Sequence, residues 1–534
     1  MINPVLHHIL SIMGETNNRI LPVGIQSFEK IRKEGLLYVD KTEIIWNLVN
    51  SNKTYNYLSR PRRFGKSLLV DTLQAYFEGR KELFEGLKIM DLEKEWVKRP
   101  VVRLDMSRAG STAHELNAYL NLAFKEYERK YGIEASASDS LSNRFDIIIQ
   151  SAYEQTGQQV AILIDEYDSP LQHSWKTSHH EDLRNVMRNF YSPLKDCEPM
   201  LRFVFLTGIT KFSQMSIFSE LNNITNISMD HEYAGICGIT KEELETQMSA
   251  DVDALAVKMN LTRTQTLDAL REFYDGYHFA AQSPDIFNPY SLLNAMAKSK
   301  LDYYWFTSGT PTYLIEMLKK FQVMPSDIGR CEADKSDFDA PTEMMVSIMP
   351  LLYQSGYITI KGYDPETELF TLDIPNKEIR VGLYRSLLPN YIGMTTPKGA
   401  TTIAKMSALI RRNDMNGALQ MLQAFLATVP YCNNADSEGH YQQMMYVIFS
   451  ILDNYVDVEV RTPSGRVDMV LRTATHLYLF ELKLNKDAAA AMKQIDLKEY
   501  PKRFALCGLP IVKVGINFDV ATHNITDWKI EDVM

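Results

Sequence analysis

Short apolar runs alternate with helical patterns in the first third of the chain. Residues 54–58, TYNYL, have the β-branched and aromatic character of a short buried strand. Residues 67–77, SLLVDTLQAYF, then repeat apolar side chains at helical spacing. The runs VAILI (160–164) and FVFL (203–206) are continuously apolar, which is typical of strands covered on both faces. This pattern predicts a parallel sheet with covering helices.

The middle of the chain changes character twice. Residues 240–300 follow a helical pattern that opens with Thr240-x-x-Glu243, the spacing of a capping box. Residues 344–356, MMVSIMPLLYQSG, predict a helix, and the runs YITIKGY and ELFTLDIP after it predict a β-hairpin. A helix followed by a hairpin is typical of a winged-helix unit. No basic recognition helix accompanies it, which favours packing against a neighbouring domain over DNA binding.

A third pattern occupies the C-terminal part. The helical stretch EGHYQQMMYVIFSILDN is followed by three apolar strand patterns, YVDVEVRT, RVDMVLRT and HLYLFELKLN. A second helical stretch, AAAAMKQIDLKEYPKRF, comes next. The order helix, three strands, helix predicts a separate α/β module.

Length and composition limit the function classes. A chain of 534 residues exceeds a single hydrophobic core, so we expect three or four domains. The five cysteines form no CxxC pair, which argues against a zinc site and for a reducing, cytoplasmic compartment. We find no signal peptide and no run of roughly 18–20 apolar residues that could span a membrane. The net charge of −10 leaves only local patches for contact with nucleic acid.

The candidate chemistry begins between the first strand and helix. Gly65-Lys66-Ser67 ends the stretch SRPRRFGKS as a phosphate-binding loop ends, although Arg60 stands where the usual pattern has its first glycine. A helix N-terminus after a strand favours anion binding. Lys66 would reach the β- and γ-phosphates of a nucleotide, and Ser67 would ligate Mg²⁺. An accidental Gly-Lys-Ser in a basic loop is the alternative.

Acidic residues at the end of a second strand support the nucleotide interpretation. Asp165 would hold Mg²⁺ through water, and Glu166 would orient or deprotonate the attacking water. Thr207, at the end of a further strand, could sense the γ-phosphate. Asp165 and Glu166 could instead only cap a helix, and the arginines of the loop could be exposed surface charges. The candidate nucleotide-binding residues are Arg60, Arg62, Arg63, Phe64, Gly65, Lys66, Ser67, Asp165 and Thr207, with Glu166 as the catalytic candidate.

The C-terminal module carries a second set of acids. Glu481 and Lys483 are two residues apart in a strand and therefore project to the same side. With Asp468 on the preceding strand they have the layout of a PD-(D/E)XK nuclease core. Asp468 and Glu481 would bind Mg²⁺ or Mn²⁺ through oxygen ligands, Lys483 would act on the nucleophilic water, and Gln494 would support the site. Solvent-exposed acids and lysines at strand ends are the alternative.

In sequence order, several motifs resemble the AAA-ATPase-like family that is widespread in gut Bacteroidetes. Arginine in place of the first glycine is usual in that family, and members commonly carry a C-terminal PD-(D/E)XK nuclease-like domain. The resemblance implies a P-loop ATPase fold that binds ATP and gives the nucleotide roles to Lys66, Ser67, Asp165 and Glu166. Asp40 and Lys41 match the family without a derivable role beyond helix capping. The motifs are YVDKT (38–42), SRPRRFGKS (59–67), IDEYDSP (164–170), LTGITKF (206–212), YDGYHF (274–279) and NPYS (288–291).

These observations predict a multidomain α/β protein. The division we expect is a P-loop AAA-like ATPase core (20–240), a helical lid (241–335), a winged-helix-like unit (336–390), a helical connector (391–432) and a PD-(D/E)XK nuclease-like domain (433–534).

The predicted function is ATP binding, with ATP hydrolysis coupled to metal-dependent cleavage of nucleic acid. DNA is favoured over RNA as the partner, although the sequence does not decide between them. The alternative is a nucleotide-controlled switch whose C-terminal domain binds without cleaving. AAA relatives often form rings, so a homo-oligomer is one of the possible states, and the sequence leaves the oligomeric state open. No membrane partner is expected.

Overall fold

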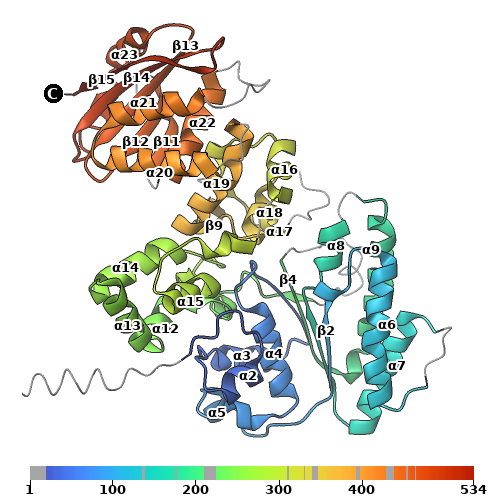
Figure 1. The fold of residues 1–534 in the computed structure, drawn as a ribbon. Helices are drawn as coiled ribbons and strands as arrows, with labels where there is room; N and C mark the ends of the chain where they lie inside the picture. Colours follow the sequence, from blue (N-terminus) through green and yellow to red (C-terminus); the bar gives the residue numbers. More distant parts are fainter. Residues whose placement is uncertain are drawn as a thin grey trace, which may run out of the picture. The chain divides into compact units, whose positions relative to one another are not determined.

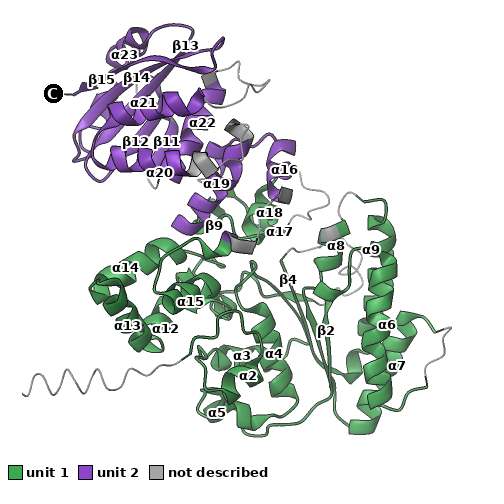
Figure 2. Ribbon diagram, viewed as in Figure 1, with its two compact units in different colours: residues 1–305, 332–376 green, residues 306–331, 377–534 purple. Residues whose placement is uncertain are grey.

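The computed structural model consists of two compact units (Figure 2). Unit 1 comprises residues 1–305 and 332–376, and unit 2 comprises residues 306–331 and 377–534. The five-part division stays a prediction. The structure describes residues 20–134, 139–174, 177–209, 224–308, 312–329, 331–339, 347–392, 397–427, 438–452, 455–462 and 465–533.

The predicted parallel sheet is present in unit 1. Its strand order is β2-β3-β4-β1-β5, and every neighbouring pair is parallel. Because these strands are parallel, the loops after β1, β3 and β4 all emerge at the same edge of the sheet, where ligands of open α/β sheets bind. The strands are β1 (Tyr55–Ser59), β2 (Val101–Asp105), β3 (Val160–Asp165), β4 (Leu201–Gly208) and β5 (Thr225–Asn226).

Helices cover both faces of this sheet (Figure 1). The helices α6, α7 and α9 bury one face in a core that includes Leu116, Phe145, Ile162 and Phe190. The helix α4 packs on the other face. The helices of this part are α2 (Phe28–Lys33), α3 (Thr42–Val49), α4 (Lys66–Phe77), α5 (Ile89–Leu92), α6 (Ala113–Lys130), α7 (Leu141–Thr156), α8 (Ser169–Ser174), α9 (His180–Tyr191) and α10 (Pro193–Asp196).

The helical segment predicted after the sheet follows in unit 1. Thr240 caps α12 and Glu243 completes the capping box, which confirms the prediction from the T-x-x-E spacing. The buried pair of Lys41 Nζ with Glu243, 2.5 Å apart, ties this helix to the segment before β1. The elements are β6 (Ile239–Thr240), α12 (Lys241–Thr246), α13 (Ser249–Met259), α14 (Arg263–Tyr274), β7 (Ile286–Phe287) and α15 (Pro289–Lys298).

The predicted helix and hairpin are also confirmed in unit 1. The helix α18 precedes two antiparallel strands, β9 and β10, and β8 extends them to a sheet of order β8-β10-β9. These elements are β8 (Cys331–Ala333), α17 (Lys335–Asp339), α18 (Met349–Gln354), β9 (Thr359–Asp364) and β10 (Leu369–Asp373).

Unit 2 is an α/β module around a mixed sheet of order β11-β12-β13-β14-β15. Only β13 and β14 pair in parallel among these strands, and a parallel pair requires a crossover, which α23 supplies. The strands are β11 (Tyr455–Thr462), β12 (Gly465–Arg472), β13 (Leu477–Leu484), β14 (Ile511–Asp519) and β15 (Asn524–Asp532). The helices are α16 (Thr312–Lys320), α19 (Lys377–Ile392), α20 (Pro397–Arg411), α21 (Met415–Leu426), α22 (Glu438–Ile451), α23 (Ala488–Leu497) and α24 (Tyr500–Arg503).

Short 3-10 helices join several of these elements. They are η1 (Lys81–Phe84), η2 (Met106–Arg108), η3 (Glu198–Met200), η4 (His231–Tyr233), η5 (Tyr304–Ser308) and η6 (Pro325–Asp327). Among the described residues, no helix combines the length and the apolar character that crossing a membrane requires.

One acidic residue of unit 1 is unusually buried. Asp275 follows α14 and is only 1% exposed. Burial, with a smaller contribution from Asp285, raises the pKa of its carboxyl to about 7, while the backbone N–H of Gly276 and the charges of Arg271 and Lys361 oppose the rise. An aspartate in an unfolded chain has a pKa of about 4. Between about pH 4 and 7 the folded state therefore binds a proton that the unfolded state releases, and stability falls as the pH rises.

We predict that Asp275→Asn removes this pH dependence. The melting temperature of the variant relative to that of wild type should rise from pH 5 to pH 8. The corresponding change in the relative free energy of unfolding is at most about 4 kcal/mol. Thermal unfolding of both proteins at a series of pH values measures it. Asp91→Asn, at an exposed position of α5, is the matched control and should show a constant difference. A constant difference for Asp275→Asn as well would contradict the prediction.

Candidate functional site

The loop between β1 and α4 has the shape that an anion site requires. Gly65, the N-cap residue directly before α4, adopts a φ of +95°, and an added side chain there would be strained. No side chain within the described residues caps α4. The first backbone N–H groups of this helix are therefore available to a phosphate.

Lys66 lies at the centre of this loop. Its side chain is almost completely buried, and Nζ donates hydrogen bonds to the carbonyl oxygens of Arg60 and Pro61 at 2.8 and 3.1 Å. Burial lowers the pKa of the ammonium group, while the nearby carboxylates of Glu166 and Asp165 oppose this effect. The ammonium group is thus turned toward the concave side of the loop, where it is close to both acids.

The acids at the end of β3 meet the loop. The Ser67 hydroxyl hydrogen-bonds to the Asp165 carboxylate, and burial raises the pKa of Asp165. Burial also raises the pKa of Glu166, which is half-buried and has a φ of +48° directly after the strand. A serine hydroxyl beside a carboxylate is a suitable donor set for Mg²⁺. The structure therefore brings Lys66, Ser67, Asp165 and Glu166 together.

The predicted arginines are placed differently. The Arg60 guanidinium is 1% exposed and donates to the carbonyl oxygens of Ser228 and Tyr233 at 2.8 and 3.0 Å, so its side chain serves the loop rather than facing a phosphate. Arg63 donates to the carbonyl oxygen of Tyr304 at 2.8 Å. Arg62 is exposed. Arg60 could therefore contact a nucleotide only through its backbone.

Two other predicted residues are buried. Phe64 is 1% exposed, and its ring packs edge-on against Tyr277 and Phe279. Thr207 is fully buried near the end of β4, one residue before that strand ends. Both therefore shape the site from inside the protein.

Sequence reasoning missed one acid of this edge. Asp105 ends β2 and is aligned with Asp165 in the parallel pairing of β2 with β3. It contributes to the raised pKa of Asp165. The signal was present in the sequence, since Asp105 follows an apolar run, VVRL, as Asp165 does.

An apolar pocket beside Gly65 was also missed. It lies in unit 1 between the loop, the segment before α3, the segment before β6 and α15. No single motif could reveal it, because its walls come from four separate stretches of sequence. Its lining includes Leu37, Tyr38, Phe64, Leu68, Ile236, Cys237 and Leu293.

Unit 2 holds the second set of acids. The Asp468 carboxylate accepts a hydrogen bond from the backbone N–H of Leu482 at 2.7 Å. The backbone pairing between β12 and β13 runs from Arg472 only as far as Met469. At the next residue, the side chain of Asp468 accepts the hydrogen bond from β13 in place of a backbone carbonyl. This contact holds Asp468 beside the residues on either side of Leu482.

Those residues are Glu481 and Lys483, which share one face of β13. Glu481 is fully buried, and Lys483 Nζ donates to its Oε1 at 2.7 Å and to the carbonyl oxygen of Leu482 at 2.9 Å. A buried carboxylate requires a cation or hydrogen-bond donors. The arrangement therefore places two carboxylates and one ammonium group together, as the strand spacing predicts.

Gln494 reaches this site indirectly. Its Nε2 lies 3.5 Å from the Tyr500 hydroxyl, which donates to the carbonyl oxygen of Arg466 at 2.6 Å. The carboxylates of Asp468 and Glu481 contribute to the raised pKa of Tyr500. Tyr500 is thus a member of the site that sequence reasoning missed.

Gln442 is a second missed member. From α22 its Nε2 donates to the carbonyl oxygen of Asp468 at 2.7 Å. A lone glutamine or tyrosine carries no spacing signal, so neither Gln442 nor Tyr500 could be selected from the sequence. No cluster of three acids, histidines or cysteines arranged for metal binding occurs in the described part of the chain. The oxygen donors available to a divalent cation are the paired carboxylates.

Comparisons with known proteins match both ends of the chain to families. A family model described as a predicted AAA-ATPase matches residues 22–218, and one of the PD-(D/E)XK nuclease superfamily matches residues 436–528. An uncharacterized protein in the vnfD 5′ region of Azotobacter chroococcum mcd 1 is 32% identical over 532 residues, which cover 96% of this chain and 99% of the relative. The chain belongs to the predicted AAA-ATPase family. The resemblance found in the motifs is thereby confirmed, together with the nuclease superfamily domain at the C-terminal end.

A solved structure is also similar to this AAA-ATPase family member. It is Cdc6p from Pyrobaculum aerophilum, with 8% sequence identity, 66% of this chain and 94% of that chain covered, and a TM-score of 0.25. A TM-score at this level does not establish a shared fold.

Proposed function

We propose that this AAA-ATPase family protein binds and hydrolyses ATP in unit 1 and cleaves nucleic acid in its PD-(D/E)XK domain. The observation that carries the ATP part is the meeting of Lys66, Ser67, Asp165 and Glu166 at one edge of a parallel sheet. The observation that carries the nuclease part is the pairing of Lys483 with buried Glu481 next to Asp468.

The residues of the first site have separate roles in this proposal. The N–H groups at the start of α4 and the Lys66 ammonium hold the phosphates. Ser67 and Asp165 hold Mg²⁺, which neutralises phosphate charge. Glu166 accepts a proton from the attacking water, and its raised pKa brings it closer to neutral pH, where a general base is effective. The apolar pocket beside Gly65 takes the adenine ring, because such pockets bind the flat apolar part of a ligand.

The second site acts on a phosphodiester. Asp468 and Glu481 would hold Mg²⁺ or Mn²⁺, which would supply Lewis acidity and an activated water. Lys483 positions that water and stabilises the negative charge that develops on the phosphate. Tyr500 and Gln494 close the side of the site formed by α23 and α24.

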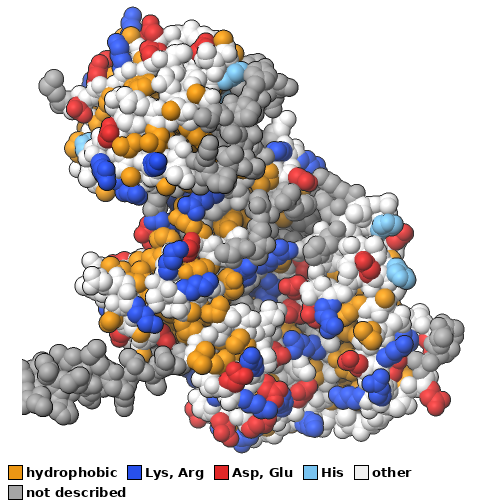
Figure 3. All heavy atoms as spheres, viewed as in Figure 1, with side chains coloured by type: hydrophobic (Ala, Val, Ile, Leu, Met, Phe, Trp, Pro, Cys, Tyr) orange, Lys and Arg blue, Asp and Glu red, His pale blue; other side chains and the backbone are white. Residues whose placement is uncertain are grey.

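The nucleic acid would be recognised by a local patch. On the face drawn in Figure 3, acidic and basic side chains are intermixed over both units. The residues after β13 are richer in basic side chains, since α23, α24 and their connection carry Lys493, Lys498, Lys502 and Arg503 against two acids, Asp496 and Glu499. We favour DNA as the partner, with these side chains contacting phosphates.

Lys66→Ala should weaken ATP binding by roughly 10- to 100-fold, because the phosphates lose a charged hydrogen-bond donor. Calorimetric titration with ATP and Mg²⁺ measures this change. Lys88→Ala removes an exposed lysine of the same unit and should leave the affinity unchanged. Equal affinities for wild type and Lys66→Ala would refute the phosphate loop.

Leu293→Trp should fill the apolar pocket and weaken ATP binding by roughly 10-fold, since the adenine ring would lose its buried contact. Binding of inorganic tripolyphosphate should be unaffected, because the phosphates do not use this pocket. Val257→Trp adds the same side chain at an exposed site of α13 and serves as the control. An unchanged affinity for ATP in Leu293→Trp would show that the pocket does not hold the base.

Glu481→Ala should reduce cleavage of DNA in Mg²⁺ or Mn²⁺ by roughly 100-fold or more, because one carboxylate of the cation site is lost. A gel assay with linear and single-stranded DNA, with and without ATP, measures the rate. Glu531→Ala, at an exposed position of β15, is the control and should cut like wild type. If wild type binds ATP but cuts neither DNA nor RNA, the nucleotide-controlled switch is the correct function.

A further inference from the structure

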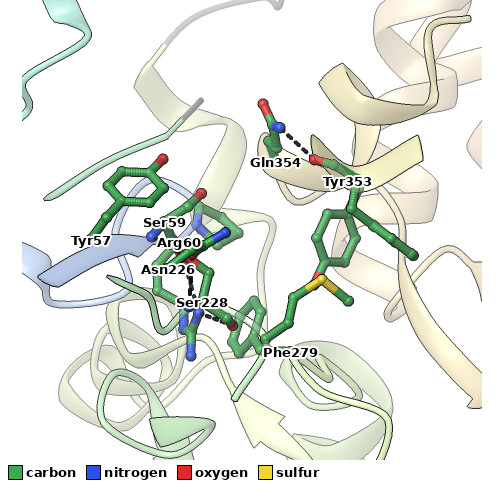
Figure 4. A pocket seen from close by; sticks show the side chains of 11 residues that line it. Tyr57, Ser59, Arg60, Asn226, Ser228, Phe279, Tyr353 and Gln354 are labelled. Carbon is green, nitrogen blue, oxygen red and sulfur yellow. Dashed lines mark hydrogen bonds between the residues drawn. The ribbon is translucent and has the colours of Figure 1, made fainter. Parts of the chain in front are cut away.

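The phosphate loop has a second face, on the side away from the start of α4, and Arg60 anchors it. The Arg60 guanidinium donates to the carbonyl oxygens of Ser228 and Tyr233 and lies 4.2 Å from the centre of the Phe279 ring. Figure 4 shows Arg60 between Ser228 and Phe279. A glycine at position 60 could make none of these contacts. The arginine that replaces the first glycine of the usual pattern therefore fastens the loop to the protein behind it.

Phe64 makes the second attachment of this face. Its ring centre lies 4.8 Å from that of Tyr277 and 5.4 Å from that of Phe279, with both pairs close to perpendicular. Tyr277 and Phe279 belong to the motif YDGYHF, to which the proposed chemistry gives no role. The motif thus packs directly on the loop.

The same motif is hydrogen-bonded to the start of the β9–β10 hairpin. His278 donates its backbone N–H to Thr359 Oγ1 at 2.8 Å, and the Thr359 hydroxyl donates to the carbonyl oxygen of His278 at 2.9 Å. His278 Nδ1 lies 2.9 Å from the carbonyl oxygen of Ile360, and the Tyr277 hydroxyl donates to that of Gly356 at 3.3 Å. Any displacement of the motif must therefore act on this end of the hairpin.

The loop also touches the hairpin directly. A Cβ atom at Gly356 would lie 2.8 Å from Cβ of Pro61, and Gly356 has a φ of +83°. The backbone thus approaches the proline ring too closely for a side chain. Beside this contact, a pocket borders Arg60 and Pro61 on one side and Tyr353 and Gln354 of α18 on the other (Figure 4). The loop therefore has space to shift on this side.

Lys66 connects the two faces of the loop. Its Nζ donates to the carbonyl oxygens of Arg60 and Pro61, whose side chains contact Phe279 and Gly356. A phosphate that takes over the ammonium group must weaken these hydrogen bonds. Lys66 would therefore hold residues 60 and 61 firmly without nucleotide and less firmly when it binds a phosphate. A ligand can shift a conformation only through such a difference in contacts between the two states.

We propose that the β9–β10 hairpin senses the nucleotide through residues 60–64 and the motif residues 277–279. This inference rests on the proposed binding of nucleotide at Lys66. In it Arg60 is a positioning residue: it acts on the loop and the hairpin and does not itself contact the phosphates.

Hydrogen exchange of the full chain, with and without a non-hydrolysable ATP analogue and Mg²⁺, tests the proposal. Binding should slow exchange at least twofold in peptides covering residues 60–70 and in peptides covering residues 356–373. Peptides from α6 and α7, on the opposite side of the sheet, should not change. Slowed exchange in the loop with unchanged exchange in the hairpin would overturn the proposal while leaving nucleotide binding intact. No binding at all would instead refute the proposed function.

Two variants test the path itself. Arg60→Gly recreates the usual G-x-x-x-x-G-K-S pattern, yet it should abolish the response of the hairpin. Tyr277→Phe is the milder change. It should reduce the response of the hairpin to half or less, while its affinity for the ATP analogue stays within twofold of wild type. Tyr363→Phe, which also removes one hydroxyl but from a partly exposed position of β9, should respond like wild type. A full hairpin response in folded Arg60→Gly or in Tyr277→Phe would contradict the path.

Discussion

A buried ammonium group requires partners, and the ammonium group of Lys66 lies where α4 begins and the sheet ends. Carbonyl oxygens of its own loop hold it at hydrogen-bonding distance, and two carboxylates from the end of β3 offset the cost of its burial. This arrangement needs β1 and β3 to end at the same edge with β4 between them, which the all-parallel strand order provides. The rest of unit 1 supports that edge.

In unit 2 the buried charged group that requires a partner is a carboxylate, and the partner is an ammonium group. Glu481 is a buried carboxylate, and Lys483 two residues along the strand supplies the cation. Asp468 is added by its contact with the backbone of β13, at the point where pairing with β12 stops. In both units regular structure is interrupted where the charged groups lie. In unit 1 the interruption is the tight loop between β1 and α4, and in unit 2 it is the end of the pairing between β12 and β13.

The loop around Lys66 shows why one residue can depart from a motif without loss of the fold. Glycine in a phosphate loop allows a backbone turn, whereas Arg60 supplies contacts that fasten the turn from behind. Those contacts link the loop to the motif at 274–279 and to the hairpin after α18, two parts of the chain with no chemistry of their own. An ATPase core and a hairpin that would otherwise be separate elements thus share one packed surface within unit 1.

Local pattern was sufficient for the elements and for the principal charged residues. The apolar runs of β3 and β4, the capping box at Thr240, the hairpin after α18 and the grouping of Glu481 with Lys483 follow from patterns of a few residues, which act over short stretches of chain. Lys66 and Asp165 each belong to a local motif, but their meeting depends on the parallel pairing of β1, β4 and β3. The side-chain role of Arg60, the alignment of Asp105 with Asp165, the pocket beside Gly65 and the contacts of Tyr500 and Gln442 do not follow from spacing. Each depends on segments far apart in sequence that meet only when the sheets and helices pack, because hydrogen bonds and van der Waals contacts act over a few ångströms in space, whatever the separation along the chain.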